Sequence, residues 1–379
     1  MKICLTINSS PWSIFKGGGQ LAVHHLACAL FSKGHQVHVL YSKYSHEQFN
    51  IDVPYKIHWV NHHDFATVNL NIFSFSRVLG PLAKKEKFDV IHGNAEESYW
   101  TGKISKKNKS IYVFTSHTPN IPTTGMLKGI NRPVRFLKSI NTYFLRSAII
   151  EADHVVAFSK FSGDLIIKGV GDTCVNKLKI IPPGVESSWF KVERKPSSNS
   201  ELLYWGRLED EKGLPELFHA LEVVSKVIKD INLTIVGEGN RLMDYKSLVA
   251  DLSLTDRVQF MGWLSSSKIQ SLSTQSSLGL FPSRVESFGL SVVEAMAAGL
   301  PVIAASGGAL QENVEKGVTG TLVPVNNAGA LAKAIISTLE NSKHTESMAR
   351  DAKKLVQHKF NWDEAANKMV DLYSFSNGM

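Results

Sequence analysis

Short apolar segments alternate with longer amphipathic ones along almost the whole chain. The short segments are rich in Val, Ile and Leu and do not alternate regularly with polar residues, which is typical of strands buried on both faces of a parallel sheet. Strand, helix and strand repeated in this way predict an α/β protein made of two doubly wound, Rossmann-like domains. The predicted strands are Lys2–Ile7, Gln36–Tyr41, Tyr55–Val60, Phe88–Gly93, Ser110–His117, His154–Ser159, Lys179–Pro182, Leu202–Gly206, Asn232–Gly237, Arg257–Gly262, Ser277–Pro282, Pro301–Ala305 and Gly320–Pro324.

A polar stretch near the middle of the chain separates the two sets of strands. Residues Trp189–Ser200 contain basic residues, a proline and a cluster of Ser and Asn, and a new apolar segment begins at residue 201. This composition predicts an interdomain linker, with domains at residues 1–190 and 191–360. Doubly wound sheets bind ligands at the carboxyl ends of their strands, so we expect a ligand in the cleft between the domains.

Charge is distributed unequally between the two halves. Residues 1–190 carry 22 Lys and Arg against 12 Asp and Glu, whereas residues 191–379 carry 20 against 22. The first half is therefore expected to face an anionic partner or surface. No nucleic-acid-binding motif accompanies this charge, so nucleic acid is not an expected partner.

The cysteines and the apolar segments bear on location. Three cysteines without a CxxC pair favour a reducing compartment and argue against a disulfide framework or a zinc site. We find neither a signal-peptide pattern nor an apolar stretch long enough for a transmembrane helix, and therefore expect a cytoplasmic protein.

Two glutamates in the second half indicate the chemistry. Glu286 and Glu294 lie eight positions apart, about 80° past two full helical turns, so they would not share one helix face. A loop glutamate, a helix start and then a helix glutamate fit the spacing better. The free N–H groups of a helix start suit a phosphate, and two carboxylates beside it suit the hydroxyls of a sugar and a ribose. Two structural alternatives remain open, because Ser291 and Glu294 also form a capping-box pattern and Glu286 could be an ordinary loop carboxylate.

A second candidate segment, Gly206–Gly213, directly follows a predicted strand. Arg207 offers a planar fork to a diphosphate and Lys212 a point charge. The alternative is a surface turn with mixed charge. The three acidic residues between the two bases favour that alternative unless they point to solvent.

These two segments together resemble the signature of the retaining nucleotide-sugar glycosyltransferases of family four, which have the GT-B fold. The resemblance extends over nearly the whole chain and implies that residues 361–379 form a helix returning to the first domain. In the first domain a glycine loop would let the backbone approach the donor closely. The further matching segments are Gly17–Gly19, Pro182–Val185, Val236–Gly239, Phe260–Gly262, Gly308–Glu312, Gly317–Gly320 and Phe360–Trp362.

The resemblance also implies roles for single residues. Arg207 and Lys212 would hold the donor diphosphate and stabilise the leaving group. Glu294 would accept hydrogen bonds from the ribose, Glu286 would bind the transferred sugar, and His117 would lie near that sugar. The other donor-binding positions implied are Gly18, Gly19, Gly237, Gly262, Trp263, Leu264, Ser287, Phe288, Gly289 and Leu290.

The sequence also bears on metal use and mechanism. No Asp-x-Asp pair occurs, so we expect no metal, with the two bases taking over the role of the cation. No residue is marked as a nucleophile, and the resemblance implies retention by front-side substitution, with the leaving phosphate helping to deprotonate the acceptor. The expected donor is a UDP- or GDP-sugar, and no further cofactor is expected.

The acceptor side is expected in the basic first half. Residues Thr123–Arg146 contain five basic residues, no acid and many apolar ones. Such a stretch suits peripheral docking on an anionic membrane, where a glycan or a lipid-linked acceptor could be met in cell-surface polysaccharide or glycolipid synthesis. An ordinary helix covering the sheet would fit equally well. Two other functions remain as alternatives: an epimerase using Glu96 and Glu97, and a non-catalytic binding protein, which the intact site residues disfavour.

Overall fold

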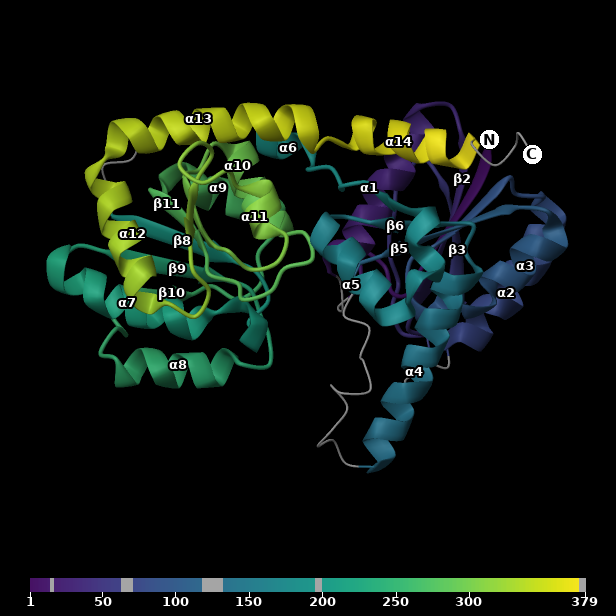
Figure 1. Ribbon diagram of the computed structural model, residues 1–379, viewed down its shortest axis with the longest axis horizontal. Helices are drawn as coiled ribbons and strands as arrows, with labels where there is room; N and C mark the ends of the chain where they lie inside the picture. The colour runs from purple at the N-terminus through teal and green to yellow at the C-terminus, as the bar shows by residue number, and fades with distance from the viewer. Residues whose placement is uncertain (14–16, 63–70, 118–131, 195–199, 375–379) are drawn as a thin grey trace. The chain divides into compact units, whose positions relative to one another are not determined.

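Each half of the chain forms its own parallel sheet (Figure 1). The structure is a computed structural model that describes residues 1–13, 17–62, 71–117, 132–194 and 200–374, without the side chains of residues 132–138. The chain divides into a first unit, Met1–Gly184 with Trp362–Met379, and a second unit, Val185–Asn361. Both are α/β units of the doubly wound kind, which confirms the predicted fold class.

The first unit contains a seven-stranded parallel sheet in the order β3-β2-β1-β4-β5-β6-β7. The order reverses between β1 and β4, which is where such sheets bind ligands. The strands are β1 Lys2–Ile7, β2 Gln36–Lys43, β3 Lys56–Asn61, β4 Val90–Gly93, β5 Ile111–Ser116, β6 His154–Ala157 and β7 Leu178–Ile180.

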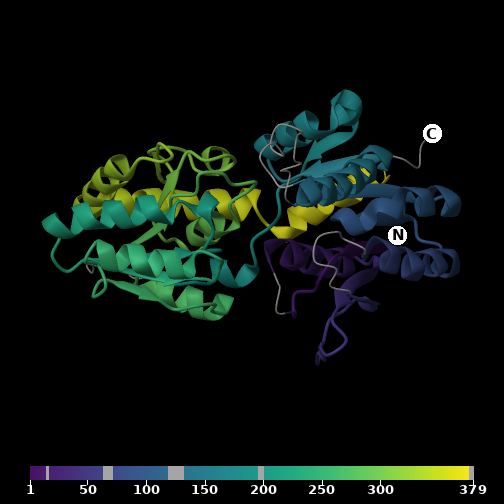
Figure 2. The same cartoon turned by 90° about the horizontal axis from the view of Figure 1, so that it is seen from below.

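Helices cover both faces of this sheet, which explains why its strands are apolar without alternation. Ile3 and Leu5 of β1 pack in the core that includes residues of α1 and α14, whereas Cys4 packs on the opposite face with residues of α2. The carboxy-terminal helix α14 lies alongside α1, as the resemblance implies (Figure 2). The helices are α1 Gly18–Ser32, α2 Asn71–Glu86, η1 Glu96–Trp100, α3 Thr101–Asn108, α4 Arg132–Glu151, α5 Lys160–Val170, η2 Asp172–Lys177 and α14 Trp362–Ser374.

The second unit contains a six-stranded parallel sheet in the order β10-β9-β8-β11-β12-β13. Its strands are β8 Glu201–Trp205, β9 Asn232–Val236, β10 Val258–Phe260, β11 Leu278–Phe281, β12 Val302–Ala305 and β13 Thr321–Val323. Its helices are α6 Ser187–Phe190, η3 Asp210–Lys212, α7 Leu214–Val227, α8 Leu242–Asp251, α9 Ser266–Gln275, α10 Leu290–Ala298, α11 Leu310–Asn313, α12 Ala328–Glu340 and α13 Ser342–Lys359.

Every strand predicted from the sequence has a counterpart, with ends that differ by no more than two residues. The structure does not agree with the linker that the sequence predicts at Trp189–Ser200. Trp189 is 1% exposed within α6, and the guanidinium of Arg194 donates to the carbonyls of Ser273, Ser276 and Gly299 at 3.1, 2.8 and 2.6 Å. The structure therefore divides the chain after Gly184 rather than after residue 190, and returns to the first unit at Trp362 rather than at residue 361. Residues 195–199 of the expected linker lie outside the described residues.

We predict that Arg194→Met destabilises the second unit by about 3 kcal/mol, because three carbonyls lose a charged donor. Urea denaturation followed by tryptophan fluorescence measures the change. The matched control is Arg350→Met, at an exposed position of α13, where the free energy of unfolding should change by no more than about 0.5 kcal/mol. Equal stability of the two variants would contradict the anchoring role of Arg194.

Candidate functional site in the second unit

The two segments identified from the sequence follow neighbouring strands. Residues 206–213 follow β8 and residues 282–289 follow β11, and these strands pair in parallel with Leu202 opposite Leu278. The strand order runs outward from this pair in both directions. Both segments therefore meet at the switch point of the sheet, where a crevice for a ligand is expected.

An ion pair joins the two segments. The Lys212 ammonium lies 2.6 Å from Oε1 of Glu286, and these side chains are only 14% and 18% exposed. The hydroxyl of Ser283 donates to the same oxygen at 2.9 Å. The backbone carbonyl of Glu286 accepts from the amide of Ala309 at 2.9 Å, which fixes the loop itself. Glu286 is thus a held, partly buried carboxylate rather than an ordinary exposed one.

Arg207 does not join this pair. Its side chain is 66% exposed and lies 2.9 Å from Glu211. An exposed pair of this kind contributes little to stability.

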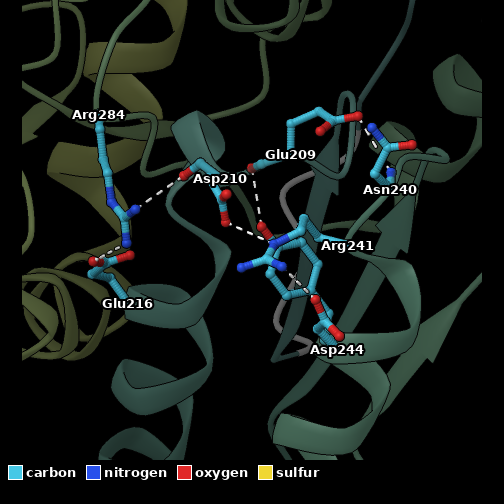
Figure 3. Close-up of polar contacts among 8 residues, drawn as sticks. Glu209, Asp210, Glu216, Asn240, Arg241, Asp244 and Arg284 are labelled. Atoms are coloured by element: carbon cyan, nitrogen blue, oxygen red, sulfur yellow. Dashed lines mark hydrogen bonds and ion pairs between the residues drawn. The ribbon is translucent and has the colours of Figure 1, made fainter. Parts of the chain in front are cut away.

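The acidic residues between the two bases have partners of their own, and Figure 3 shows those of Glu209 and Asp210. The carboxylate of Asp210 lies 2.8 Å from Nε of Arg241, and the carboxylate of Glu209 accepts from the amide of Asn240 at 3.3 Å. Asp210 and Glu211 are paired with arginines rather than with Lys212. The acidic run therefore leaves Lys212 to Glu286.

Arg284 is a site residue that the sequence did not reveal. Its amide donates to the carbonyl of Glu211 at 2.8 Å, and its guanidinium reaches the carbonyl of Asp210 at 3.2 Å and the carboxylate of Glu216 at 2.7 Å (Figure 3). It ties the loop after β11 to the loop after β8. The sequence offered one indication of this role, because Arg284 lies in the same segment as Glu286. Its partners could not be read from the sequence, because they lie about seventy residues away.

Glycines let three loops approach each other at the ends of β8, β9 and β10. The amide of Gly206 donates to Val236 at 3.0 Å, and that of Gly237 donates to Gly262 at 2.8 Å. Gly237 has a φ of 139°, and a β-carbon there would overlap the carbonyl oxygen of Gly206. Trp263 follows Gly262 with 54% of its surface exposed, and Leu264 is partly exposed. Through these hydrogen bonds the loops after β9 and β10 are joined to the loop after β8, which contains Lys212.

The predicted helix start is present. Gly289 precedes α10 with a φ of 86°, and a β-carbon there would overlap the side chain of Leu310. No side chain caps this helix, so the capping-box alternative with Ser291 is excluded. The first N–H groups of α10, beginning at Leu290, have no partner inside the helix and can receive an anion. Phe288 anchors the turn by an edge contact with Phe360, with ring centroids 5.4 Å apart.

Glu294 projects from the second turn of α10 and differs electrostatically from Glu286. Burial raises its pKa from the ordinary value of 4.5 to about 7, and the charge of Glu186 adds to this effect. The indole N–H of Trp205 donates to its Oε2 at 2.9 Å and lowers the pKa against that trend. The carboxyl is therefore partly protonated near neutral pH in the free protein.

Two predicted positions of the first unit also meet. His117 follows β5, and its Nε2 lies 2.8 Å from the side-chain oxygen of Asn94. A β-carbon at Gly19 would lie 3.2 Å from Cγ of His117, so the glycine permits close packing at the start of α1, beside Gly18. Burial lowers the pKa of His117 to about 4, so the imidazole is neutral at physiological pH.

Comparisons with known proteins identify the family of this chain. Residues 16–189 match the family model described as Glycosyltransferase Family 4, and residues 185–355 match the model described as Glycosyl transferases group 1. This chain belongs to the family four glycosyltransferases. Its fold is GT-B, and its reaction depends on a nucleotide sugar.

Known proteins are similar to this glycosyltransferase over all or part of its length. An uncharacterized glycosyltransferase of Methanocaldococcus jannaschii is 27% identical over 99% of this chain and 98% of its own. Glycogen synthase of Mycobacterium tuberculosis is 30% identical over 59% of this chain and 54% of its own. The structure resembles sucrose-phosphate synthase of Thermosynechococcus elongatus, with a TM-score of 0.81 at 23% identity over 98% of both chains. It also resembles HepE of Anabaena in complex with UDP and glucose, with a TM-score of 0.75 at 20% identity over 99% of both.

Glu97 of the glycosyltransferase is buried in the first unit. It is 2% exposed, and its Oε1 lies 3.2 Å from the hydroxyl of Ser98 and 3.5 Å from that of Thr6. Burial raises its pKa to about 8, and raises that of Glu96 as well. A largely uncharged carboxyl packed beneath β1 suits a structural role better than the proton transfer that an epimerase requires.

The basic stretch Thr123–Arg146 is only partly described. Its residues up to 131 lie outside the described residues, and the rest belongs to α4. Within the described residues no helix is long and apolar enough to cross a membrane. The same residues contain no group of three or more His, Cys, Asp or Glu side chains placed to hold a metal ion.

Glu294→Gln is predicted to separate stability from binding. Because the pKa of Glu294 is raised in the folded protein, its ionisation costs stability as the pH rises from 4.5 through 7. The glutamine avoids this cost, so above pH 7 the melting temperature of the free protein should rise by about 2–4 °C. Binding of a nucleoside diphosphate should weaken roughly tenfold, because a charged acceptor is lost.

Thermal melts and calorimetric titrations between pH 5 and 9 measure both effects. The control is Glu340→Gln, at an exposed position of α12, which should change neither quantity. A glutamine variant at 294 that binds as tightly as the native protein would remove this carboxyl from the site.

Proposed function

We propose that this glycosyltransferase moves a sugar from a UDP- or GDP-sugar to a hydroxyl acceptor, with retention of anomeric configuration and without a metal ion. The observation that carries the proposal is the Lys212–Glu286 pair beside the uncapped start of α10. It brings a cation, sugar-binding oxygens and free amides together at one switch point, which suits a diphosphate sugar.

The donor would exchange partners with the free site. A diphosphate entering beside α10 would draw Lys212 from Glu286 and Arg207 from Glu211, and the released Glu286 carboxylate would accept from sugar hydroxyls. Glu294 would accept from the ribose. The complexes of HepE with UDP and with UDP-glucose support a uridine nucleotide as the first donor to test.

The two bases are also the reason to propose a metal-free reaction. As the bond between C1 of the sugar and the phosphate oxygen breaks, negative charge develops on the leaving diphosphate. Lys212 is only 14% exposed, so its positive charge acts with little screening by water. Lys212 and Arg207 would then supply the stabilisation that a cation provides in metal-dependent enzymes.

Retention would follow from attack on the face from which the diphosphate leaves. The acceptor oxygen bonds to C1 as the C1–phosphate bond breaks, and the proton of the acceptor passes to the leaving phosphate. The neutral imidazole of His117, held by Asn94, suits hydrogen bonding to a sugar hydroxyl rather than general acid catalysis at neutral pH.

We predict that nucleotide release from a panel of UDP-, GDP- and ADP-sugars persists in EDTA, and that Lys212→Ala lowers kcat/KM at least about 100-fold. The control is Lys333→Ala, at an exposed position of α12, with unchanged activity. Donor isomerisation without nucleotide release would favour the epimerase. Loss of activity in EDTA that Mg²⁺ restores would overturn the metal-free reaction, and binding of no donor would overturn the proposal.

The acceptor is proposed to lie at an anionic membrane surface, in cell-surface polysaccharide or glycolipid assembly on the cytoplasmic side. The support is the excess of ten positive charges in residues 1–190, 22 against 12. We expect cosedimentation with vesicles that contain phosphatidylglycerol and not with vesicles of phosphatidylcholine alone. Added salt should release the protein, because the attraction is electrostatic. Equal binding to both vesicles, or to neither, would contradict membrane docking.

A further inference from the structure

We propose that Trp205 is a positioning residue for donor binding, whose indole N–H orients the Glu294 carboxylate toward the nucleotide. The inference rests on the proposed function, because it assigns Glu294 to the donor ribose. Trp205 stands immediately before Gly206, where the segment that resembles the family signature begins, and that resemblance gives it no role.

Strand pairing fixes the position of the Trp205 backbone, from which the indole projects. Trp205 is the last residue of β8 and is paired in register with Val236 of β9. Its side chain is 5% exposed. Indole has a single hydrogen-bond donor, and here that donor lies 2.9 Å from Oε2 of Glu294.

Two aromatic rings hold the indole plane. Trp189 of α6 stacks on Trp205 with centroids 5.7 Å apart and planes 7° from parallel. Phe281 of β11 meets it edge to face at 5.0 Å and 83°. Because rings from two other elements fix its plane, the indole N–H points in one direction. A loosely packed donor could follow the carboxylate, whereas this one determines where the carboxylate lies.

The contact leaves the second oxygen of Glu294 for a ligand. Within the described part of the chain, Trp205 is the hydrogen-bond partner of this carboxyl. The indole N–H binds Oε2 and thereby fixes the orientation of Oε1, for which the described residues provide no hydrogen-bond donor. A carboxylate that binds two ribose hydroxyls must be both ionised and fixed in rotation, and the indole contributes to both.

The charged groups near α10 do not provide this orientation. Glu186, which precedes α6, raises the pKa of Glu294. Arg194 donates to the carbonyl of Gly299 at the far end of α10, and Lys353 of α13 donates to the carbonyl of Val192. The indole is thus the group that favours the ionised carboxylate against burial and against Glu186.

Trp205→Phe keeps an aromatic ring in the stack and removes the N–H. Dissociation constants for UDP and GDP, measured from pH 6 to 9 with the nucleotide that the native protein binds, should be roughly tenfold larger at pH 7 in this variant. The pH midpoint of binding should move upward from about 7, because loss of a donor to the ionised form raises the pKa of Glu294.

The matched control is Trp189→Phe. It is the same substitution in the neighbouring ring, and Trp189 makes no hydrogen bond through its indole nitrogen within the described residues. Its pH midpoint should equal that of the native protein. A native-like midpoint in Trp205→Phe, or equal shifts in both variants, would overturn the positioning role. Failure of the native protein to bind either nucleotide would instead count against the proposed function.

A second measurement reads the titration on the native protein and uses the variants to assign the signal. The chain has 7 tryptophans, whose indole N–H signals can be followed by NMR after ¹⁵N labelling. The signal of Trp205 is identified by its absence in Trp205→Phe and its shift in Glu294→Gln. In the native protein this signal should titrate with a midpoint near pH 7, because its acceptor, Glu294, changes charge there. The same signal should be independent of pH in Glu294→Gln. Absence of any such titrating indole would overturn the inference.

Discussion

The parallel pairing of β8 with β11 is the constraint on which the candidate site depends. These strands are far apart in sequence, yet Leu202 lies opposite Leu278 in the sheet. Their carboxyl ends therefore open at the same edge, and the loops that follow them bring Lys212 to within 2.6 Å of Glu286. A register shift of one residue would turn side chains to the other face of the sheet and would separate the pair.

The charged side chains at this edge of the sheet pair with residues from other elements as well as with their neighbours in sequence. The run from Arg207 to Lys212 contains two bases and three acids, which looks self-neutralising when read in order. In the fold the carboxylate of Asp210 pairs with Arg241 (Figure 3). The carboxylate of Glu211 pairs with the exposed Arg207. Lys212 remains as a partly buried cation with a carboxylate partner that a ligand can replace.

The free site is not arranged for greatest stability. Glu294 is placed where burial disfavours its charge, and an indole held between two rings counteracts that effect only in part. A ligand that offers hydroxyl donors to the carboxylate would complete its hydrogen bonds. This opposition between stability of the free protein and readiness to bind is typical of functional sites, where polar groups are held ready for a partner.

The sequence by itself determined the thirteen strands, because apolar runs long enough for a strand must be buried on both faces of a parallel sheet. It also predicted a loop position for Glu286 and a helix position for Glu294, because residues eight apart would not share one helix face. Tertiary structure decided the rest. The hydrogen bonds of Arg194, Arg284 and Trp205 all join residues about seventy or more positions apart. Trp189 is buried because it stacks on Trp205, which belongs to another element of the second unit. Local patterns report which residues prefer to be buried, but only the packed sheet decides which polar groups meet when they are.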